Sequence, residues 1–207
     1  MTKTYPPFAP PLPFATKPPE EWTKREAKEY LAWVIGHIDE RTDALLDYLG
    51  VQAASDHVGV LSDAGSRAAT LLKDPTFSQP SQGPTTITLK GHQFEQDLGP
   101  TLTTSGYALA ADLGLLVVRY LLTDFPEAIH WEVGKGPRRY VWYNRPTLVV
   151  PGRDPFDPVG ASIGQAYGIL TDDRDGRIWM LMYERCVADM AGDTTQDWAA
   201  LLRPQRK

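Results

Sequence analysis

Hydrophobic residues recur along this chain in patterns that predict where helices begin and end. From residue 24 to residue 49, apolar side chains fall on one face of a helix and charged side chains on the other. Thr23 and Glu26 have the spacing of a capping box, and Gly50 is a residue type that commonly ends helices. The sequence therefore predicts a long amphipathic helix over residues 24–49.

The longest apolar segment, residues 107–122, has hydrophobic side chains at almost every helical angle. This pattern predicts a helix that is surrounded by other elements. Gly114 within it costs roughly 1 kcal/mol relative to alanine, a cost usually tolerated where another element must approach closely. Asp112 and Arg119 interrupt the segment, so we expect no membrane span of about 18 apolar residues.

Residues 129–150 are predicted to form a hairpin and a further strand. The turn signal at 134–137 gives the hairpin arms 129–133 and 138–143, and 147–150 is an apolar, β-branched strand. Tyr140 and Trp142 alternate with Arg139, Val141 and Tyr143, so one face of that arm is expected to pack inward and the other to meet solvent.

Shorter signals predict the remaining elements. They are a helix over 63–73 capped by Ser62, a strand at 87–89, a helix from Pro158 to about 170 capped by Asp157, a helix over 178–190 ended by Gly192, and a terminal helix at Trp198. Together the elements predict one α+β domain over residues 20–207. This domain is mostly helical, with a small antiparallel sheet.

Residues 1–19 contain seven prolines, which remove backbone donors and exclude both a helix and a central strand. We expect an extended, polyproline-like arm. Three interpretations remain for it: an arm laid over the domain surface, a docking peptide for an aromatic groove in another protein, or a disordered segment.

The charge distribution bears on the kind of partner. The 207-residue chain has a formal net charge of −5, which argues against a dedicated nucleic-acid binder. The charge is uneven: residues 20–74 carry 11 acids and 6 bases, whereas residues 130–153 carry one acid and five bases. Cys186 is the single cysteine, and residues 1–19 lack the apolar run of a signal peptide. We therefore expect a cytoplasmic protein.

Two segments resemble catalytic or metal-binding motifs, but each lacks residues that the motif requires. The lysine in 134–137 is followed by Gly-Pro instead of the Ser or Thr of a phosphate loop, and the acidic turn at 171–176 lacks carboxylates at the first and twelfth positions of a calcium loop. The four histidines are scattered, and Cys186 lies on the expected inner face of a helix. We expect no metal, no cofactor and no catalytic residue.

Two groups of residues are candidates for binding. The first is the aromatic and basic set Trp131, Arg138, Arg139, Tyr140, Trp142, Tyr143 and Arg145. It is open to three interpretations: packing on the core, a protein-binding surface, or stacking on single-stranded nucleic acid. The second is the pair Asp112 and Arg119, each of which needs a partner such as Arg138, Arg139, Glu132 or a tyrosine hydroxyl. The alternative is that the pair forms a polar pocket beside the hairpin.

Several short segments give the chain a family resemblance. They are residues 22–27 with Tyr30 and Trp33, then 39–41, 111–114, 131–132, 143–146 and 156–158. With this spacing the chain resembles an uncharacterised family of bacterial proteins, some of which lie near polymorphic-toxin genes. The resemblance implies a helix-rich α+β domain and an immunity-like binding role. The family pattern often has an acidic residue near Arg119, where this chain departs from it.

The leading hypothesis is a non-enzymatic protein that binds another protein, as an immunity-type inhibitor of a bacterial toxin. The alternative is an enzyme or small-ligand protein with a polar pocket near Asp112, Arg119 and the 129–150 hairpin. A deep pocket with converging polar groups would favour the second hypothesis, whereas an exposed aromatic patch would favour the first. The sequence leaves the oligomeric state open.

Overall fold

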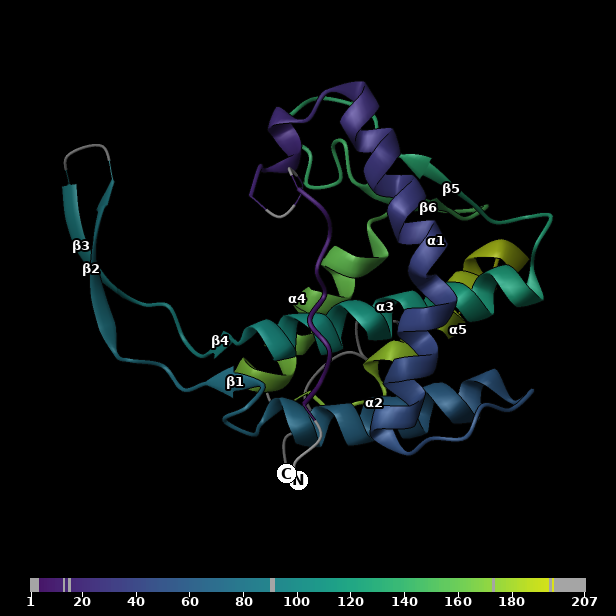
Figure 1. Ribbon diagram of the computed structural model, residues 1–207, viewed down its shortest axis with the longest axis horizontal. Helices are drawn as coiled ribbons and strands as arrows, with labels where there is room; N and C mark the ends of the chain where they lie inside the picture. Colours follow the sequence, from purple (N-terminus) through teal and green to yellow (C-terminus); the bar gives the residue numbers. More distant parts are fainter. Residues whose placement is uncertain are drawn as a thin grey trace.

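The computed structural model describes residues 4–12, 14, 16–89, 92–172, 174–193 and 195. Within these residues the chain forms five α-helices, the short 3-10 helix η1 (Pro19–Glu21) and three two-stranded antiparallel sheets (Figure 1). The predicted mostly helical α+β class is confirmed. The expected single sheet is replaced by three small ones. The terminal helix predicted at Trp198 lies outside the described residues.

Helix α3 (Thr104–Asp124) runs through the middle of the helical body, as Figure 1 shows. It begins after Thr103, whose side chain accepts a hydrogen bond from the backbone N–H of Gly106. The other four helices all pack against it: α1 (Lys24–Leu49), α2 (His57–Leu72), α4 (Pro158–Thr171) and α5 (Ile178–Ala191). The prediction of a helix surrounded by others is therefore confirmed.

Gly114 explains how closely α3 and α4 approach each other. A Cβ atom at this position would lie 2.6 Å from the carbonyl oxygen of Pro158 and 2.9 Å from the Cβ of Ser162. Ser162 is fully buried and donates a hydrogen bond to the carbonyl of Ala110 on α3. The predicted reason for a glycine in the middle of this helix is confirmed.

The composition of α3 qualifies one expectation from the sequence. Despite Asp112 and Arg119, its 21 residues are long and apolar enough to cross a membrane by length and composition alone. In the structure, 78% of its most apolar window is buried inside the protein. The core helix of a globular protein passes the same test, so this finding is weak evidence for a membrane span.

Helix boundaries follow the predicted caps where the signals are local. Glu26 N–H donates to the Thr23 hydroxyl at 3.2 Å, and the Glu26 carboxylate accepts from Thr23 N–H at 2.6 Å, so the capping box on α1 is confirmed. Gly50 follows with φ 66°. Asp157 caps α4 through Gly160 N–H, and Gly192 ends α5 with φ 69°.

Two elements differ from their predicted bounds. Helix α2 starts at His57, six residues before the predicted start, because the Asp56 side chain caps it through Gly59 N–H. The strand predicted at 87–89 belongs to a longer ribbon, in which β2 (Pro84–Leu89) pairs with β3 (His92–Asp97). The short pair β1 (Ser78–Gln79) and β4 (Thr101–Leu102) lies at its base, and the ribbon projects far from the helical body (Figure 1).

The predicted hairpin over 129–143 is wrong in its second arm. Strand β5 (His130–Val133) pairs instead with β6 (Pro146–Val149), so that Trp131 lies opposite Leu148. Residues 138–143 form successive turns, because their backbone N–H groups find acceptors nearby: Tyr140 N–H donates to Pro137 and Tyr143 N–H to Tyr140. The alternation of Tyr140 and Trp142 with their neighbours therefore occurs in a loop and not in a strand.

Candidate functional site

Residues 134–145 form a closed loop between β5 and β6, which we call the arginine loop. Its ends are held together by two backbone hydrogen bonds, from Gly134 N–H to the carbonyl of Arg145 at 2.8 Å and from Asn144 N–H to the carbonyl of Gly134 at 3.0 Å. A compact surface loop with adjoining ends is an Ω-loop, a type that is frequently functional.

The interior of the arginine loop is filled by its own residues. A Cβ atom on Gly134 would lie 1.9 Å from the carbonyl oxygen of Trp142, so only glycine fits where the two ends meet. The rings of Tyr140 and Trp142 lie 5.0 Å apart in a tilted contact. These contacts and the successive turns give the loop a defined shape.

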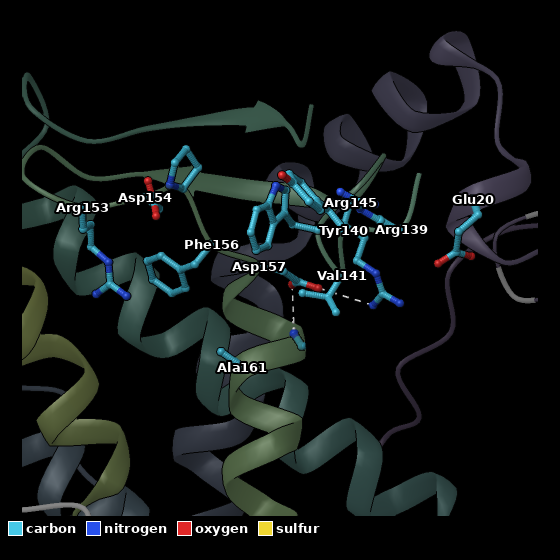
Figure 2. Close-up of a pocket in the computed structure, with 13 residues that line it drawn as sticks. Glu20, Arg139, Tyr140, Val141, Arg145, Arg153, Asp154, Phe156, Asp157 and Ala161 are labelled. Carbon is cyan, nitrogen blue, oxygen red and sulfur yellow. Dashed lines mark hydrogen bonds and ion pairs between the residues drawn. The ribbon is translucent and has the colours of Figure 1, made fainter. Parts of the chain in front are cut away.

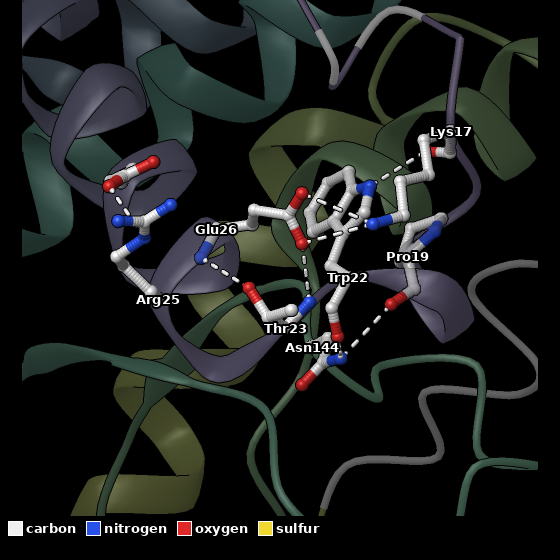
Figure 3. A network of polar contacts seen from close by, with 8 residues as sticks. Lys17, Pro19, Trp22, Thr23, Arg25, Glu26 and Asn144 are labelled. Carbon is white, nitrogen blue, oxygen red and sulfur yellow. Dashed lines mark hydrogen bonds and ion pairs between the residues drawn. The ribbon is translucent and has the colours of Figure 1, made fainter.

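Asn144 anchors the arginine loop to the start of α1. It is buried, has φ 59°, and donates from its side-chain amide to the carbonyls of Pro19 at 3.0 Å and Trp22 at 2.9 Å. Trp22 in turn donates from its indole N–H to the carbonyl of Lys17, whose ammonium pairs with Glu26 (Figure 3). The loop is thus fixed to the same polar network that caps α1.

A cleft of about 690 Å³ opens between the arginine loop and the start of α4 (Figure 2). It is lined by Glu20, Arg139, Tyr140, Val141, Trp142, Arg145, Arg153, Asp154, Pro155, Phe156, Asp157, Gly160 and Ala161. The structure therefore brings together four residues of the predicted binding set: Arg139, Tyr140, Trp142 and Arg145.

The other three residues of that set do not line this cleft. Arg138 is exposed on the arginine loop next to Arg139. Trp131 is half-buried and packs against a small hydrophobic cluster containing Val34 of α1. Tyr143 is half-buried within the loop. The predicted set therefore divides between the cleft, the loop surface and the core.

The arginines at the cleft differ in how well they are satisfied. Arg145 has a long ion pair of 3.4 Å with Asp157, and its buried Nε has no hydrogen-bond partner in the described structure. Arg153 lies over the Phe156 ring at 4.4 Å and pairs with Asp189 at 3.4 Å. Arg139 has neither a hydrogen bond nor an ion pair within the described part of the chain, and the same is true of Arg138.

Acidic groups at the cleft keep its charge mixed. Glu20 and Asp154 are exposed at the cleft, whereas Asp157 is largely occupied by its capping bond to Gly160 N–H and its pair with Arg145. Burial raises the pKa of Asp157, although Gly160 N–H and Arg145 oppose the shift. The cleft can therefore receive a ligand with an anionic group and apolar surface, and Arg139 is the arginine of its lining that has no partner among the described residues.

Asp112 and Arg119 lie in two separate clusters that both face α1. Asp112 is fully buried and accepts hydrogen bonds from the Arg41 guanidinium and from the Tyr5 hydroxyl, with 2.9 Å to Arg41 Nε. Arg119 pairs with Asp43 at 2.6 Å and with Asp39 at 3.2 Å. Asp112 thus has a tyrosine partner as predicted. The arginine that pairs with it is Arg41, so the prediction that this would be an arginine of the loop is wrong.

Burial is the largest influence on the ionisation of Asp112. It raises the pKa of the Asp112 carboxyl, whereas the hydrogen bonds and charge of Arg41 lower it, as does the hydrogen bond from Tyr5. The pKa of Tyr5 is raised, first by burial and then by the charge of Asp112. Glu132, the other proposed partner, pairs with Lys135 at 2.8 Å.

Sequence analysis missed a third polar cluster, at the point where α2, α3 and α5 meet. Asp124 accepts a hydrogen bond from the Tyr183 hydroxyl at 2.5 Å and contacts His57 Nδ1 at 2.8 Å. The His57 ring stacks on Tyr120 with centroids 4.0 Å apart. Burial and the bond to Asp124 raise the pKa of Tyr183. The cluster joins three helices, and no sequence spacing marks it.

Within the described residues there is no group of three or more His, Cys, Asp and Glu side chains that could hold a metal ion. In comparisons with known proteins, no family model, no curated protein and no solved structure matched the chain.

Proposed function

We propose that this chain is a non-enzymatic protein that binds another protein through the arginine loop and the adjoining cleft. The observation that carries the proposal is the pair Arg138 and Arg139, two neighbouring guanidinium groups that have no partner among the described residues and lie on a loop of defined shape. Arg, Tyr and Trp dominate the binding energy of protein interfaces, and a pre-ordered loop loses little entropy on binding.

The chemistry of the surface favours a protein as the partner over a nucleic acid. The chain has a net charge of −5, and the cleft itself includes Glu20 and Asp154 beside its arginines. Both acids would repel a phosphate backbone. A protein surface with carboxylates opposite Arg138 and Arg139 fits this mixed pattern, and complementary charge accelerates association.

The resemblance described from the sequence supports a more specific version of this proposal. We propose a cytoplasmic immunity-type inhibitor, whose arginine loop binds an acidic surface of a bacterial toxin. The test is co-expression with the products of genes adjacent to its own. A neighbouring product that stops growth alone, and does not stop it together with this chain, supports the inhibitor role. Undiminished toxicity from every toxic neighbour would contradict it.

The binding surface is tested with two double variants of equal charge change. Arg138→Glu with Arg139→Glu reverses two positive charges on the loop, whereas Lys24→Glu with Lys28→Glu reverses two positive charges on the exposed face of α1. Affinity purification from the source organism should recover a partner with the wild type and the α1 control, and lose it with the loop variant.

Salt dependence provides a second measure of the same interaction. The association rate of the purified pair should fall as ionic strength rises, because exposed charges are screened within about 10 Å at 0.1 M salt.

In the affinity purification, an identical set of captured proteins for the wild type and both double variants would exclude the arginine loop as the interface, whatever the identity of those proteins.

The cleft also favours a second candidate function, binding of a small anionic ligand. Its volume of about 690 Å³ is within the range of small-molecule sites, and the guanidinium groups of Arg139 and Arg145 line it, with the Arg145 side chain 38% exposed. In this proposal the site lies at Arg139 and Arg145, while Asp112 is closed off by Arg41 and Tyr5. Melting curves of the wild type and of Arg145→Ala with phosphate, citrate and phenyl phosphate test it. An equal response of both forms to every probe excludes this site.

A further inference from the structure

The first described residues of the chain occupy a groove between α1 and α3. Tyr5 is only 2% exposed, and its ring packs edge-on against Tyr48 with centroids 4.9 Å apart and lies 6.3 Å from Phe77. Its hydroxyl donates to Asp112, the buried carboxylate at the floor of the groove. A segment that is remote in sequence thus supplies a polar contact that the core requires.

Arg41 binds the backbone of the same segment. Its guanidinium donates to the carbonyls of Pro7 at 2.9 Å and Pro6 at 3.3 Å, while it also pairs with Asp112. Prolines have no N–H, so recognition through their carbonyls uses the polar groups that such a segment offers. Aromatic grooves that bind proline-rich peptides work in a similar way.

Phe8 completes the contact at the next position of the groove. Its ring meets Trp33 edge-on at 5.4 Å, and the Arg41 guanidinium lies 5.5 Å from its centroid. We call residues 4–8 the plug and the surface formed by Tyr48, Phe77, Asp112, Arg41 and Trp33 the plug groove. The groove selects a tyrosine, two proline carbonyls and a phenylalanine along a short extended segment.

The plug joins the rest of the chain through a short segment with few contacts. Ala9, Pro11 and Leu12 are exposed, and Leu12 has 75% of its surface open to solvent. The plug can therefore leave the groove by rotation within residues 9–12 without unfolding α1. The emptied groove would retain a buried carboxylate with one partner fewer, which makes refilling favourable.

We propose that the plug groove is a binding site for a Tyr-Pro-Pro-Phe segment supplied in trans, and that this segment is the plug of a second copy of the chain. Each copy carries the segment that its groove fits, so reciprocal exchange restores every contact of the closed form. Exchange of identical segments between copies is a low-cost route to a dimer. The proposal is independent of the arginine loop, which lies outside the groove.

The first experiment uses wild-type chains with two different C-terminal tags. The two preparations are mixed at high concentration, incubated, diluted and captured through one tag. We expect the second tag to be recovered in a species of twice the chain mass. An excess of a synthetic peptide with the sequence of residues 4–12 should reduce this recovery, whereas the same peptide with phenylalanine in place of its tyrosine should have less effect.

Complementation distinguishes plug exchange from any other dimer. Tyr5→Ala removes the plug side chain and keeps the groove, whereas Asp112→Asn weakens the groove and keeps the plug. Each variant alone should remain monomeric by light scattering, and their mixture should form a 1:1 dimer with a melting temperature above that of either variant. If a variant fails to fold, the wild-type capture with peptide competition still decides the question.

Three results would overturn the proposal. Tagged wild-type copies that are never captured together exclude exchange between copies. Capture that is insensitive to both the peptide and Tyr5→Ala shows a dimer built on another surface. Binding of the labelled peptide to Tyr5→Ala, with no dimer in any mixture, shows that the groove accepts the segment but that a second copy does not supply it.

Discussion

The plug groove and the arginine loop both contain arginines, but those arginines differ in whether they have partners within the chain. In the groove, Arg41 is bound to Asp112 and to two proline carbonyls, and its side chain is 11% exposed. On the loop, Arg138 and Arg139 are exposed and make no hydrogen bond or ion pair with any described residue. One arginine has its donors engaged inside the molecule, and two keep theirs available.

This difference shows how a charged residue should be interpreted. A buried ion pair is costly to break, because the remaining charge stays desolvated without a partner. An exposed and unpaired charge contributes little to folding. Holding such charges in place on an ordered loop is useful mainly for binding a partner. Within one chain the contacts of the groove therefore stabilise the fold, whereas the loop keeps its arginines available for a partner, and variants of each should separate the two properties.

The largest expected loss of stability follows from Asp112→Ala. It leaves the Arg41 guanidinium in the groove without its carboxylate and Tyr5 without its acceptor, so the free energy of unfolding should fall by about 3–5 kcal/mol. Urea melts of the two proteins measure this loss. A loss below about 1 kcal/mol would show that the groove relaxes around the missing charge.

Asn144→Ala should have the next largest effect. It removes the two hydrogen bonds to Pro19 and Trp22, at a cost of about 1–3 kcal/mol for the unsatisfied carbonyls. The left-handed φ of 59° adds about 1–2 kcal/mol for alanine. Asn144→Gly is the matched control, since glycine loses the bonds but adopts this φ freely. Equal melting temperatures for both variants would contradict the strain component.

Glu26 should give a smaller effect that depends on pH. Hydrogen bonds from Thr23, first from its backbone, and the contact with Lys17 lower the pKa of Glu26 to about 2 from an ordinary value of 4.5. A lowered folded-state pKa stabilises the protein above pH 4.5, and this contribution disappears as the pH falls toward 2. The melting temperatures of the wild type and Glu26→Gln should therefore converge over that range. A parallel pH dependence of the two proteins would refute the assignment.

The smallest change in stability should come from the variant with the largest effect on binding. Arg138→Glu with Arg139→Glu should alter the free energy of unfolding by less than about 0.5 kcal/mol, because neither side chain has a partner in the described part of the chain. Thermal melts beside the Lys24→Glu and Lys28→Glu control measure it. A marked drop confined to the loop variant would mean that these arginines support the fold, contrary to the comparison drawn above.

Local signals in the sequence were sufficient for much of the fold. The capping box of Thr23 and Glu26, the stop at Gly50 and the Asp157-Pro158 start each depend on residues within one helical turn. The burial of α3 could also be predicted from the sequence, because a helix surrounded by others has no polar face. The start of α2 differs from the prediction because Asp56, and not Ser62, caps this helix.

The remaining features depend on contacts that no local pattern encodes. The alternation in 138–143 fits a strand as well as a loop, and the outcome was decided by Arg145 and Asn144 closing on Gly134. The partners of Asp112 lie 71 and 107 residues away in sequence. Of the candidate site, composition identified the arginines and aromatics of the loop, but only the structure brings Arg153, Phe156 and Asp157 beside them.

The β2–β3 ribbon divides the sequence into two segments that meet again in the core. Residues before it form α1 and α2, residues after it form α3, α4 and α5, and α1 packs on α3 while α2 packs on α5. A break or an insertion in the ribbon would leave these helix contacts in place. A chain divided there becomes a two-fragment complex held by non-covalent packing, so its assembly would depend on concentration and could report whether two fused proteins meet.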